Sequence, residues 1–477
     1  MPLRIAVNYG RDAALEPAAL NEDRPMGGIR TATLALCAAL ARRGHDIHLF
    51  TVCPRPGVRD GIAFHDRAEF AGFGRAQSVD ALVAIPEVLP LLMPLQARAR
   101  VVWSGNAFQA GDCALSARWA WAPEIGRAGE TARLYTMERL HPYADRLVVK
   151  SHWQAEYMWS TLGIPRDKFV VAYNGVPLEY YQGPAVARHR HRLVYTSQVR
   201  RGLDQLLDLF PRIRAAVPEA ELHIFGYEHI DAQALRDLHG ATQPGVHWRG
   251  SLGKRALAHE LRSAGLMAYP CTLKETFCTA VAEAQAAGLP VVTSGRAALA
   301  ERVTNGVEGF VIPGHAREHG YQEAFVEAVV RLLQDDDLWT RLGWNAARKA
   351  HRLYDWNTIA ASWEAELQQA IAGREPLPPR LDPTLDLLAP EVLTVADRGM
   401  SAQVPPALAG RWLRGAWAAY GYHTASTPGL VRSGFAEGIG AEPTAAKVWA
   451  PGTRTPEREH HPAMVTSAPE ATETSND

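Results

Sequence analysis

Cysteine is scarce in this chain, which has five cysteines among 477 residues and no C-x-x-C pair. An odd number without such a pair indicates neither a disulfide framework nor a zinc ribbon, and it favours a reducing compartment. Long apolar runs are missing too: the first one stops at Asn8, too early for a signal peptide. The most apolar stretch, residues 81–97, holds three prolines and Glu87, which excludes a membrane span. We therefore expect a cytoplasmic protein, with peripheral contact at the inner face of a membrane left open.

An excess of charge of either sign is also missing. Lys and Arg total 50 against 51 for Asp and Glu, so no global charge draws the chain to nucleic acid or lipid. The apolar fraction of 47% and the charged fraction of 21% are typical of a globular protein. Nucleic acid is therefore not an expected partner, and a charged ligand needs a local cluster of residues.

What the chain does have is an alternation of short apolar runs and amphipathic segments. Residues 4–8 predict a buried strand, residues 31–43 a helix that ends at Gly44, and residues 46–51 a second strand. A second series of the same kind begins at residue 193. This order predicts an α/β protein with two tandem Rossmann-like doubly wound domains that face each other across a cleft. Ligands are expected in that cleft, because they bind beyond the carboxyl ends of such strands.

The expected boundaries follow changes in composition. A basic run at residues 188–192 separates the two series, and residues 356–372 carry apolar residues at helical spacing. The segment after that helix is rich in Pro and Ala and is expected to be largely irregular or disordered. Within it, residues 407–422 suit either a membrane-surface anchor or a short helix docked on the body, and we favour the second. The predicted parts are an N-terminal domain at 1–180, a second domain at 191–355, the helix at 356–372 and the tail at 373–477.

The most informative segment is residues 275–292, directly after a predicted strand. Residues 276–278 are expected to form the first turn of a helix, where free backbone N–H groups and the helix dipole can hold a diphosphate. Glu283 follows Glu275 with seven residues between them. Carboxylates suit hydroxyls, so the pair suggests a sugar at one end of a ligand and a ribose at the other. The alternative is an ordinary strand-helix-strand crossover whose acidic residues face solvent.

This segment resembles the donor-site signature of retaining glycosyltransferases of family 4, E-x-F-G-x-x-x-x-E-A-x-A-x-G-x-P-V-V. The matching positions are Glu275, Phe277, Glu283, Ala284, Gly288, Pro290, Val291 and Val292. The resemblance implies the GT-B fold, a nucleotide-activated sugar as donor, and a metal-independent reaction without a cofactor. It implies that Glu275 contacts the transferred sugar and Glu283 the ribose, with backbone N–H groups from Thr276, Phe277 and Cys278. The family usually has glycine at Cys278, whose thiol we interpret as packed rather than reactive.

Positive charge for a diphosphate is expected after the first strand of the second domain. The family usually supplies it in G-R-x-x-x-x-K-G, and residues 196–203 resemble a shortened form of that motif. Arg201 stands where the lysine is expected, before Gly202, and Arg200 replaces the earlier arginine. A guanidinium can hold phosphate oxygens in bidentate fashion. The alternative is two solvated arginines at a helix start, where positive charge is unfavourable; that mismatch favours a ligand.

Three weaker features complete the predicted site. Gly27 and Gly28 resemble the family's glycine loop over the donor phosphates, although any tight turn uses such a pair. Asn106, after a first-domain strand, is the acceptor-side candidate, with a turn-forming asparagine as an equal alternative. Asp335 opens a run of three aspartates, which we interpret as a helix cap; no metal site is predicted. In the family, the helix matching residues 356–372 crosses back to the first domain.

These features predict a glycosyltransferase that moves a sugar from a nucleotide-diphosphate donor, UDP- or GDP-linked, with retention of configuration. The acceptor is an unknown glycan, lipid-linked or small molecule. Glu275 and Arg201 are the predicted catalytic residues, and the resemblance covers about residues 3–370. Two rival functions stay open: an epimerase or phosphorylase of the same fold, and a degenerate glycosyltransferase that binds a sugar nucleotide as a partner or scaffold.

Overall fold

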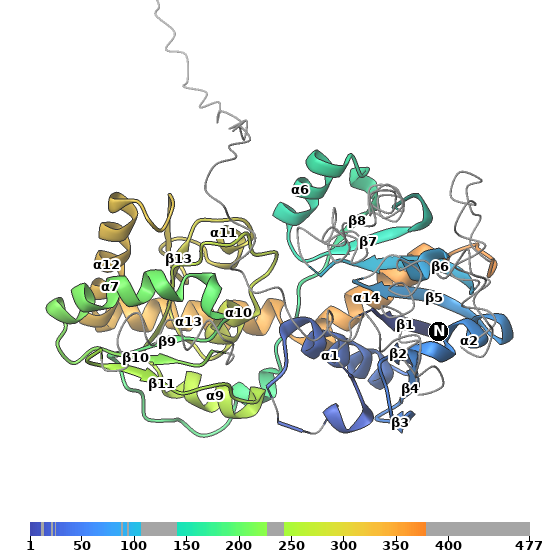
Figure 1. Cartoon of the computed structure of the whole chain (residues 1–477), viewed down its shortest axis with the longest axis horizontal. Coiled ribbons are helices and arrows are strands. Elements are labelled where there is room, and N and C mark those ends of the chain that lie inside the picture. Colours follow the sequence, from blue (N-terminus) through green and yellow to red (C-terminus); the bar gives the residue numbers. More distant parts are fainter. Residues whose placement is uncertain are drawn as a thin grey trace, which may run out of the picture. The chain divides into compact units, whose positions relative to one another are not determined.

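The computed structural model describes residues 1–10, 14–20, 22–23, 25–86, 89–92, 95–105, 141–226 and 243–377. Within them the chain forms two separate sheets, built almost wholly of parallel strands and covered by helices (Figure 1). Both sheets lie within a single compact unit. The predicted α/β class with two doubly wound sheets is confirmed.

The first sheet has eight strands in the order β3-β4-β2-β1-β5-β6-β7-β8. Strands β1 and β5 are apolar over most of their length and buried, as expected for parallel strands covered on both faces. Among the described strands, β3 at the edge pairs antiparallel with β4 and the other pairs are parallel. The strands are β1 (Arg4–Tyr9), β2 (Asp46–Thr51), β3 (Gly57–Arg59), β4 (Ile62–Asp66), β5 (Ser78–Ile85), β6 (Gln96–Trp103), β7 (Arg146–Val149) and β8 (Phe169–Val171).

The second sheet has six parallel strands in the order β11-β10-β9-β12-β13-β14. The chain builds outward from β9 to β11 on one side and then from β12 to β14 on the other. The strand order therefore reverses between β9 and β12, and doubly wound sheets bind ligands at such a switch point. The strands are β9 (Arg192–Tyr195), β10 (Glu221–Ile224), β11 (Val246–Trp248), β12 (Leu266–Tyr269), β13 (Val291–Ser294) and β14 (Gly309–Ile312).

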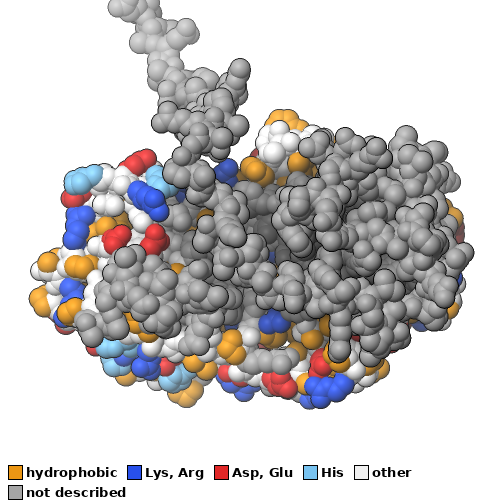
Figure 2. All heavy atoms as spheres, in the orientation of Figure 1, with side chains coloured by type: hydrophobic (Ala, Val, Ile, Leu, Met, Phe, Trp, Pro, Cys, Tyr) orange, Lys and Arg blue, Asp and Glu red, His pale blue; other side chains and the backbone are white. Residues whose placement is uncertain are grey.

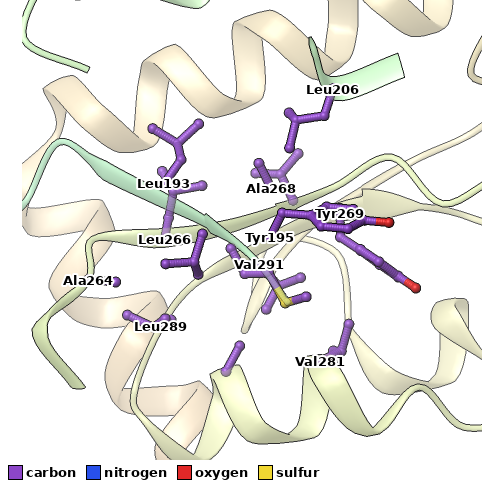
Figure 3. Packing of buried hydrophobic residues seen from close by; sticks show 14 of the residues in the cluster. Leu193, Tyr195, Leu206, Ala264, Leu266, Ala268, Tyr269, Val281, Leu289 and Val291 are labelled. Atoms are coloured by element: carbon purple, nitrogen blue, oxygen red, sulfur yellow. The ribbon is translucent and has the colours of Figure 1, made fainter. Parts of the chain in front are cut away.

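The core of the second sheet brings together residues distant in sequence (Figure 3). Leu206 packs on one side of the strands and Val281 on the other. Tyr195 and Tyr269 end β9 and β12 and lie side by side, with ring centroids 5.6 Å apart. The two strands that flank the switch point are thus fixed against each other at their carboxyl ends.

Helices cover both sheets, and α6, α13 and α14 begin after an N-cap residue whose side chain accepts a hydrogen bond from the first turn. The Asp335 carboxylate accepts a hydrogen bond of 2.8 Å from the Leu338 N–H, so the predicted capping role of Asp335 is confirmed. The helices are α1 (Gly28–Arg42), α2 (Phe70–Ala76), α6 (His152–Leu162), α7 (Leu203–Ala216), α9 (Lys254–Ser263), α10 (Thr279–Ala286), α11 (Leu299–Arg302), α12 (His319–Gln334), α13 (Asp336–Leu353) and α14 (Trp356–Ile371).

Helix α14 follows the second sheet in sequence but packs in the core of the first. Trp363 meets Trp103 of β6 edge to face, with ring centroids 5.3 Å apart. At the start of the helix, the Trp356 ring lies so close to Gly175 that a Cβ at Gly175 would come within 2.6 Å of it. The chain therefore returns to the first sheet at its last described helix.

The residues after α14 continue along the first sheet. Leu377 pairs with Ala97 of β6 in an antiparallel bridge, through two backbone hydrogen bonds of 3.1 and 3.2 Å. The start of the predicted tail is thus held by β6, whereas residues 407–422 lie outside the described residues. No helix in the described ranges is both long and apolar enough to span a membrane.

Candidate active site

Two loops leave the second sheet at its switch point and pack against each other. The loop after β9 contains a 3-10 turn, Val199–Arg201, followed by Gly202. Gly202 has φ 102°, and a Cβ there would collide with the carbonyl oxygen of Pro270 in the loop after β12. Only glycine combines this backbone conformation with so close an approach. The residue before it, Arg201, is thereby held beside the second loop.

Arg201 and Glu275 form an ion pair between these two loops. Glu275 is 8% exposed, so its charge is compensated inside the protein rather than by water. The Tyr269 hydroxyl donates a hydrogen bond of 3.0 Å to Oε1 of Glu275. Burial raises the pKa of Tyr269 well above its ordinary value, so this donor keeps its proton. The structure therefore joins the two predicted catalytic residues and orients the carboxylate.

Glu283 has a partner that sequence reasoning missed. The Lys254 ammonium lies 2.6 Å from Oε1 of Glu283, whose side chain is almost fully buried on α10. Lys254 is the first residue of α9, where positive charge opposes the helix dipole. The same mismatch singled out Arg201, and it could have found Lys254 as well.

The predicted helix start at residues 276–278 is wrong, because α10 begins at Thr279. Cys278 has φ 67° and ψ 81°, a left-handed conformation that cannot continue a helix. Phe277 is buried and packs against Tyr173, with ring centroids 6.0 Å apart, which anchors the loop before the helix. Thr276 is buried in the same loop. The three residues thus lead into the helix rather than form its first turn.

Burial raises the pKa of the Cys278 thiol to about 12. The thiol is therefore protonated at neutral pH and is a poor nucleophile. This agrees with the interpretation of Cys278 as a packed side chain.

The predicted glycine loop lies against the start of α10. Gly27 is the cap residue of α1 and Gly28 is its first residue, so the helix starts three residues before the expected Thr31. A Cβ at Gly28 would lie 3.4 Å from Oγ1 of Thr279. The beginnings of α1 and α10 therefore meet, which places two helix N-termini where an anion could bind.

Arg200 and Asn106 are the remaining residues of the predicted site. Arg200 lies in the 3-10 turn with Arg201, on the loop that holds the ion pair. Asn106, the acceptor-side candidate, lies outside the described residues. The roles assigned to individual residues by the signature stay predictions.

Family models match the two parts of the chain that form the two sheets. The model described as Glycosyltransferase Family 4 matches residues 26–180, and the one described as Glycosyl transferases group 1 matches residues 190–335. The chain belongs to glycosyltransferase family 4. The family 4 signature begins at Glu275 in the loop after β12 and continues through α10, and its first residue forms the ion pair with Arg201.

Curated relatives in this family carry transferase names. Phosphatidyl-myo-inositol mannosyltransferase of Mycobacterium leprae is 28% identical over 231 residues, which cover 46% of this chain and 59% of that protein. The chain thus spans less than two thirds of that relative's length. D-inositol 3-phosphate glycosyltransferase of Xylanimonas cellulosilytica is 26% identical over 410 residues, covering 73% of this chain and 93% of that protein.

Solved structures show the same GT-B fold. Sucrose-phosphate synthase from Thermosynechococcus elongatus superposes with a TM-score of 0.61 at 17% identity, over 77% of this chain and 99% of that one. Anabaena HepE, solved in complex with UDP-glucose, gives a TM-score of 0.55 at 16% identity, over 77% of this chain and 100% of that one. At such identities the likeness establishes the fold alone.

Proposed function

We propose that this family 4 protein transfers a sugar from a nucleotide-diphosphate donor to an acceptor hydroxyl, with retention of configuration. The observation that carries the proposal is the Arg201–Glu275 ion pair in the two loops that leave the switch point. A guanidinium there suits a diphosphate, and a carboxylate beside it suits the hydroxyls of the sugar attached to that diphosphate.

In this proposal the bound donor breaks the Arg201–Glu275 ion pair, and each of the two side chains binds the donor instead. Arg201 turns to the diphosphate and stabilises the negative charge that grows on the departing nucleotide, while the N-terminus of α10 adds its dipole. Glu275, oriented by the Tyr269 hydroxyl, accepts hydrogen bonds from the sugar. Glu283 binds the ribose, with Lys254 balancing its charge.

Retention is proposed from the family signature, by attack on the same face of the sugar with the leaving phosphate as base. No side chain acts as the nucleophile in this scheme, and no metal or cofactor takes part. A cytoplasmic location, with or without peripheral membrane contact, belongs to the same proposal.

Donor and acceptor are proposed as classes. UDP-sugars come first, because HepE, which shares the fold, was solved with UDP-glucose; GDP-sugars are the second class. Among acceptors, inositol-containing molecules come first, because the names of two relatives include phosphatidyl-myo-inositol and D-inositol 3-phosphate. Glycans, other lipid-linked molecules and small molecules follow.

The test measures donor hydrolysis and sugar transfer across a panel of UDP- and GDP-sugars. Arg201→Ala and Glu275→Ala are each expected to lower kcat/KM by about 100-fold or more, as for removal of a group that stabilises transition-state charge. The control is Arg212→Ala, on helix α7, which follows Arg201 in the chain. This change removes an exposed ion pair between Arg212 and Glu323 of α12. Unchanged turnover in both Arg201→Ala and Glu275→Ala proteins that still fold contradicts the proposal.

The same panel separates the rival functions. An epimerase converts the donor without an acceptor and without releasing the nucleotide. A degenerate family member binds a sugar nucleotide in calorimetry but turns over none of the panel. Either result replaces the transfer activity proposed above.

A further inference from the structure

An edge of the second sheet carries potential metal ligands away from the candidate active site. Glu221 and His223 lie two residues apart on β10 and so on the same face of the strand. His247 of β11 is the cross-strand partner of His223, with ring centroids 4.8 Å apart. One ligand atom from each of the three residues lies within 4.8 Å of the other two. The pairing of two strands thus gathers one carboxylate and two imidazoles.

The His223 ring is only partly satisfied by the residues around it. Its side chain is nearly fully buried, and Nε2 lies 3.2 Å from Oε2 of Glu221. Nδ1 is buried and has no hydrogen-bond partner among the described residues. A buried polar atom without a partner is unfavourable. One ring nitrogen can therefore carry the proton while the other offers a lone pair.

We propose that Glu221, His223 and His247 bind a divalent cation of the zinc type. Imidazole and carboxylate groups are common ligands of zinc, bound at about 2.0–2.2 Å. Ligand atoms around one tetrahedral ion are then about 3.4 Å apart. The three ligand atoms lie within 4.8 Å of one another, so the ligands must draw closer to bind one ion, and His247 is the exposed member of the set. Three protein ligands leave the fourth position to water.

The surroundings set the expected strength and role of this site. Nε of Arg192 lies 3.8 Å from Oε2 of Glu221, so a bound cation competes with this positive charge for the carboxylate. A cation held by both strands would also fasten β11, an edge strand of three residues, to β10. In Figure 2 histidine side chains reach the surface at the lower left, where β10 and β11 lie in Figure 1.

The site is separate from the proposed transfer reaction. Glu221 is the first residue of β10, whereas Arg201 and Glu275 follow the carboxyl ends of β9 and β12. The test can therefore read metal binding directly and does not depend on activity.

The experiment titrates the full chain with zinc alone, in competition with a chromophoric chelator. One zinc ion per chain is expected, and His247→Ala should weaken its binding at least tenfold. The matched control is His319→Ala, which removes another exposed histidine beside a glutamate, Glu323, with no third ligand among the described residues. Its affinity should equal that of the unaltered protein.

Two further readouts keep the outcome clear. Cobalt, used in place of zinc, should give a spectrum without sulfur-to-cobalt charge transfer, because no thiol belongs to the site. Zinc should raise the Tm of the unaltered protein and of His319→Ala but not of His247→Ala. Equal zinc affinity in His247→Ala and the unaltered protein, or a cobalt–thiolate spectrum, overturns the proposal.

Discussion

Cys278 occupies a backbone position that explains the usual glycine of the family signature. Its φ of 67° and ψ of 81° are left-handed, a conformation that costs a residue with a Cβ about 1–2 kcal/mol. The residue is 6% exposed, so burial of the thiol offsets part of that cost. Cys278 thus combines a strained backbone with a packed side chain.

This combination predicts opposite effects of one substitution at two cysteines. The Cys278→Gly protein should be more stable than the Cys278→Ala protein by about 1 kcal/mol, because glycine adopts a positive φ freely. At Cys37, inside α1, the order should reverse: the Cys37→Gly protein should be less stable than the Cys37→Ala protein by about 1 kcal/mol. Urea unfolding of Cys278→Ala, Cys278→Gly, Cys37→Ala and Cys37→Gly measures both differences. A Cys278→Gly protein less stable than Cys278→Ala would contradict the left-handed assignment.

His45 predicts how stability depends on pH. The Leu3 N–H donates a hydrogen bond of 3.0 Å to Nδ1 of His45, which requires that nitrogen to be unprotonated. Burial lowers the pKa of His45 below its ordinary value of 6.5, although Glu364 nearby raises it in part. A lowered folded-state pKa means that the stabilisation is complete above a pH of about 6.5 and is lost as the pH falls from there.

The measurement is the free energy of unfolding between about pH 7 and pH 5, above and below the ordinary histidine pKa. His45→Gln should lose less stability over this range than the unaltered protein, since it cannot bind the proton. His319→Gln, at an exposed position, is the control and should follow the unaltered protein. Parallel curves for all three proteins would show that His45 does not contribute.

At the scale of elements, the sequence predicted what local periodicity determines. Strand β2 has the predicted bounds, 46–51, because its apolar run is flanked by polar and turn residues. The start of α10 was missed because nothing local reveals that Cys278 takes a positive φ. Helix α1 begins earlier than the sequence predicts. Its first residue is Gly28, a poor helix former, so the sequence gives no signal of a helix there.

The candidate site was predictable in its residues but not in its pairings. Arg201 and Glu275 are 74 positions apart and meet because β9 and β12 are neighbours in the sheet. Sequence could place each of them after a strand, but the strand order that joins them is a property of tertiary structure. Lys254 pairs with Glu283 for the same reason, through the packing of α9 near α10.

The cap of α13 predicts a stability effect that separates capping from metal binding. Asp335→Ala should cost about 1 kcal/mol, because the Leu338 N–H loses its acceptor. Asp335→Asn should cost much less, since asparagine caps about as well as aspartate. Thermal unfolding with and without added manganese measures both effects. A loss in Asp335→Asn equal to that in Asp335→Ala, or stabilisation by manganese that both variants abolish, would favour a metal ligand.

At the scale of the whole molecule, each sheet's domain caps a helix of the other. The Asp23 carboxylate accepts hydrogen bonds of 2.8 and 3.0 Å from the N–H groups of Arg255 and Ala256, at the start of α9. The Glu301 carboxylate accepts from His152 and Trp153 at the start of α6, at 3.1 and 2.6 Å. Helix α14 adds an apolar link, because it lies in the core of the first sheet. The first domain therefore depends on residues from the far end of the described chain.

Two tryptophans on consecutive helices test this dependence. Trp363 of α14 is 2% exposed and packs on Trp103 of β6, so Trp363→Ala should cost about 3–5 kcal/mol by leaving a cavity in the first core. Trp344 of α13 is 60% exposed, and Trp344→Ala should change stability by about 0.5 kcal/mol or less. Urea unfolding gives both values, and limited proteolysis with mass spectrometry shows where each chain opens. Trp363→Ala should be cut first in the domain of the first sheet, although the substitution follows the second sheet in sequence. Equal stability of the two variants, or first cuts confined to the second domain, would show that α14 does not hold the first domain together.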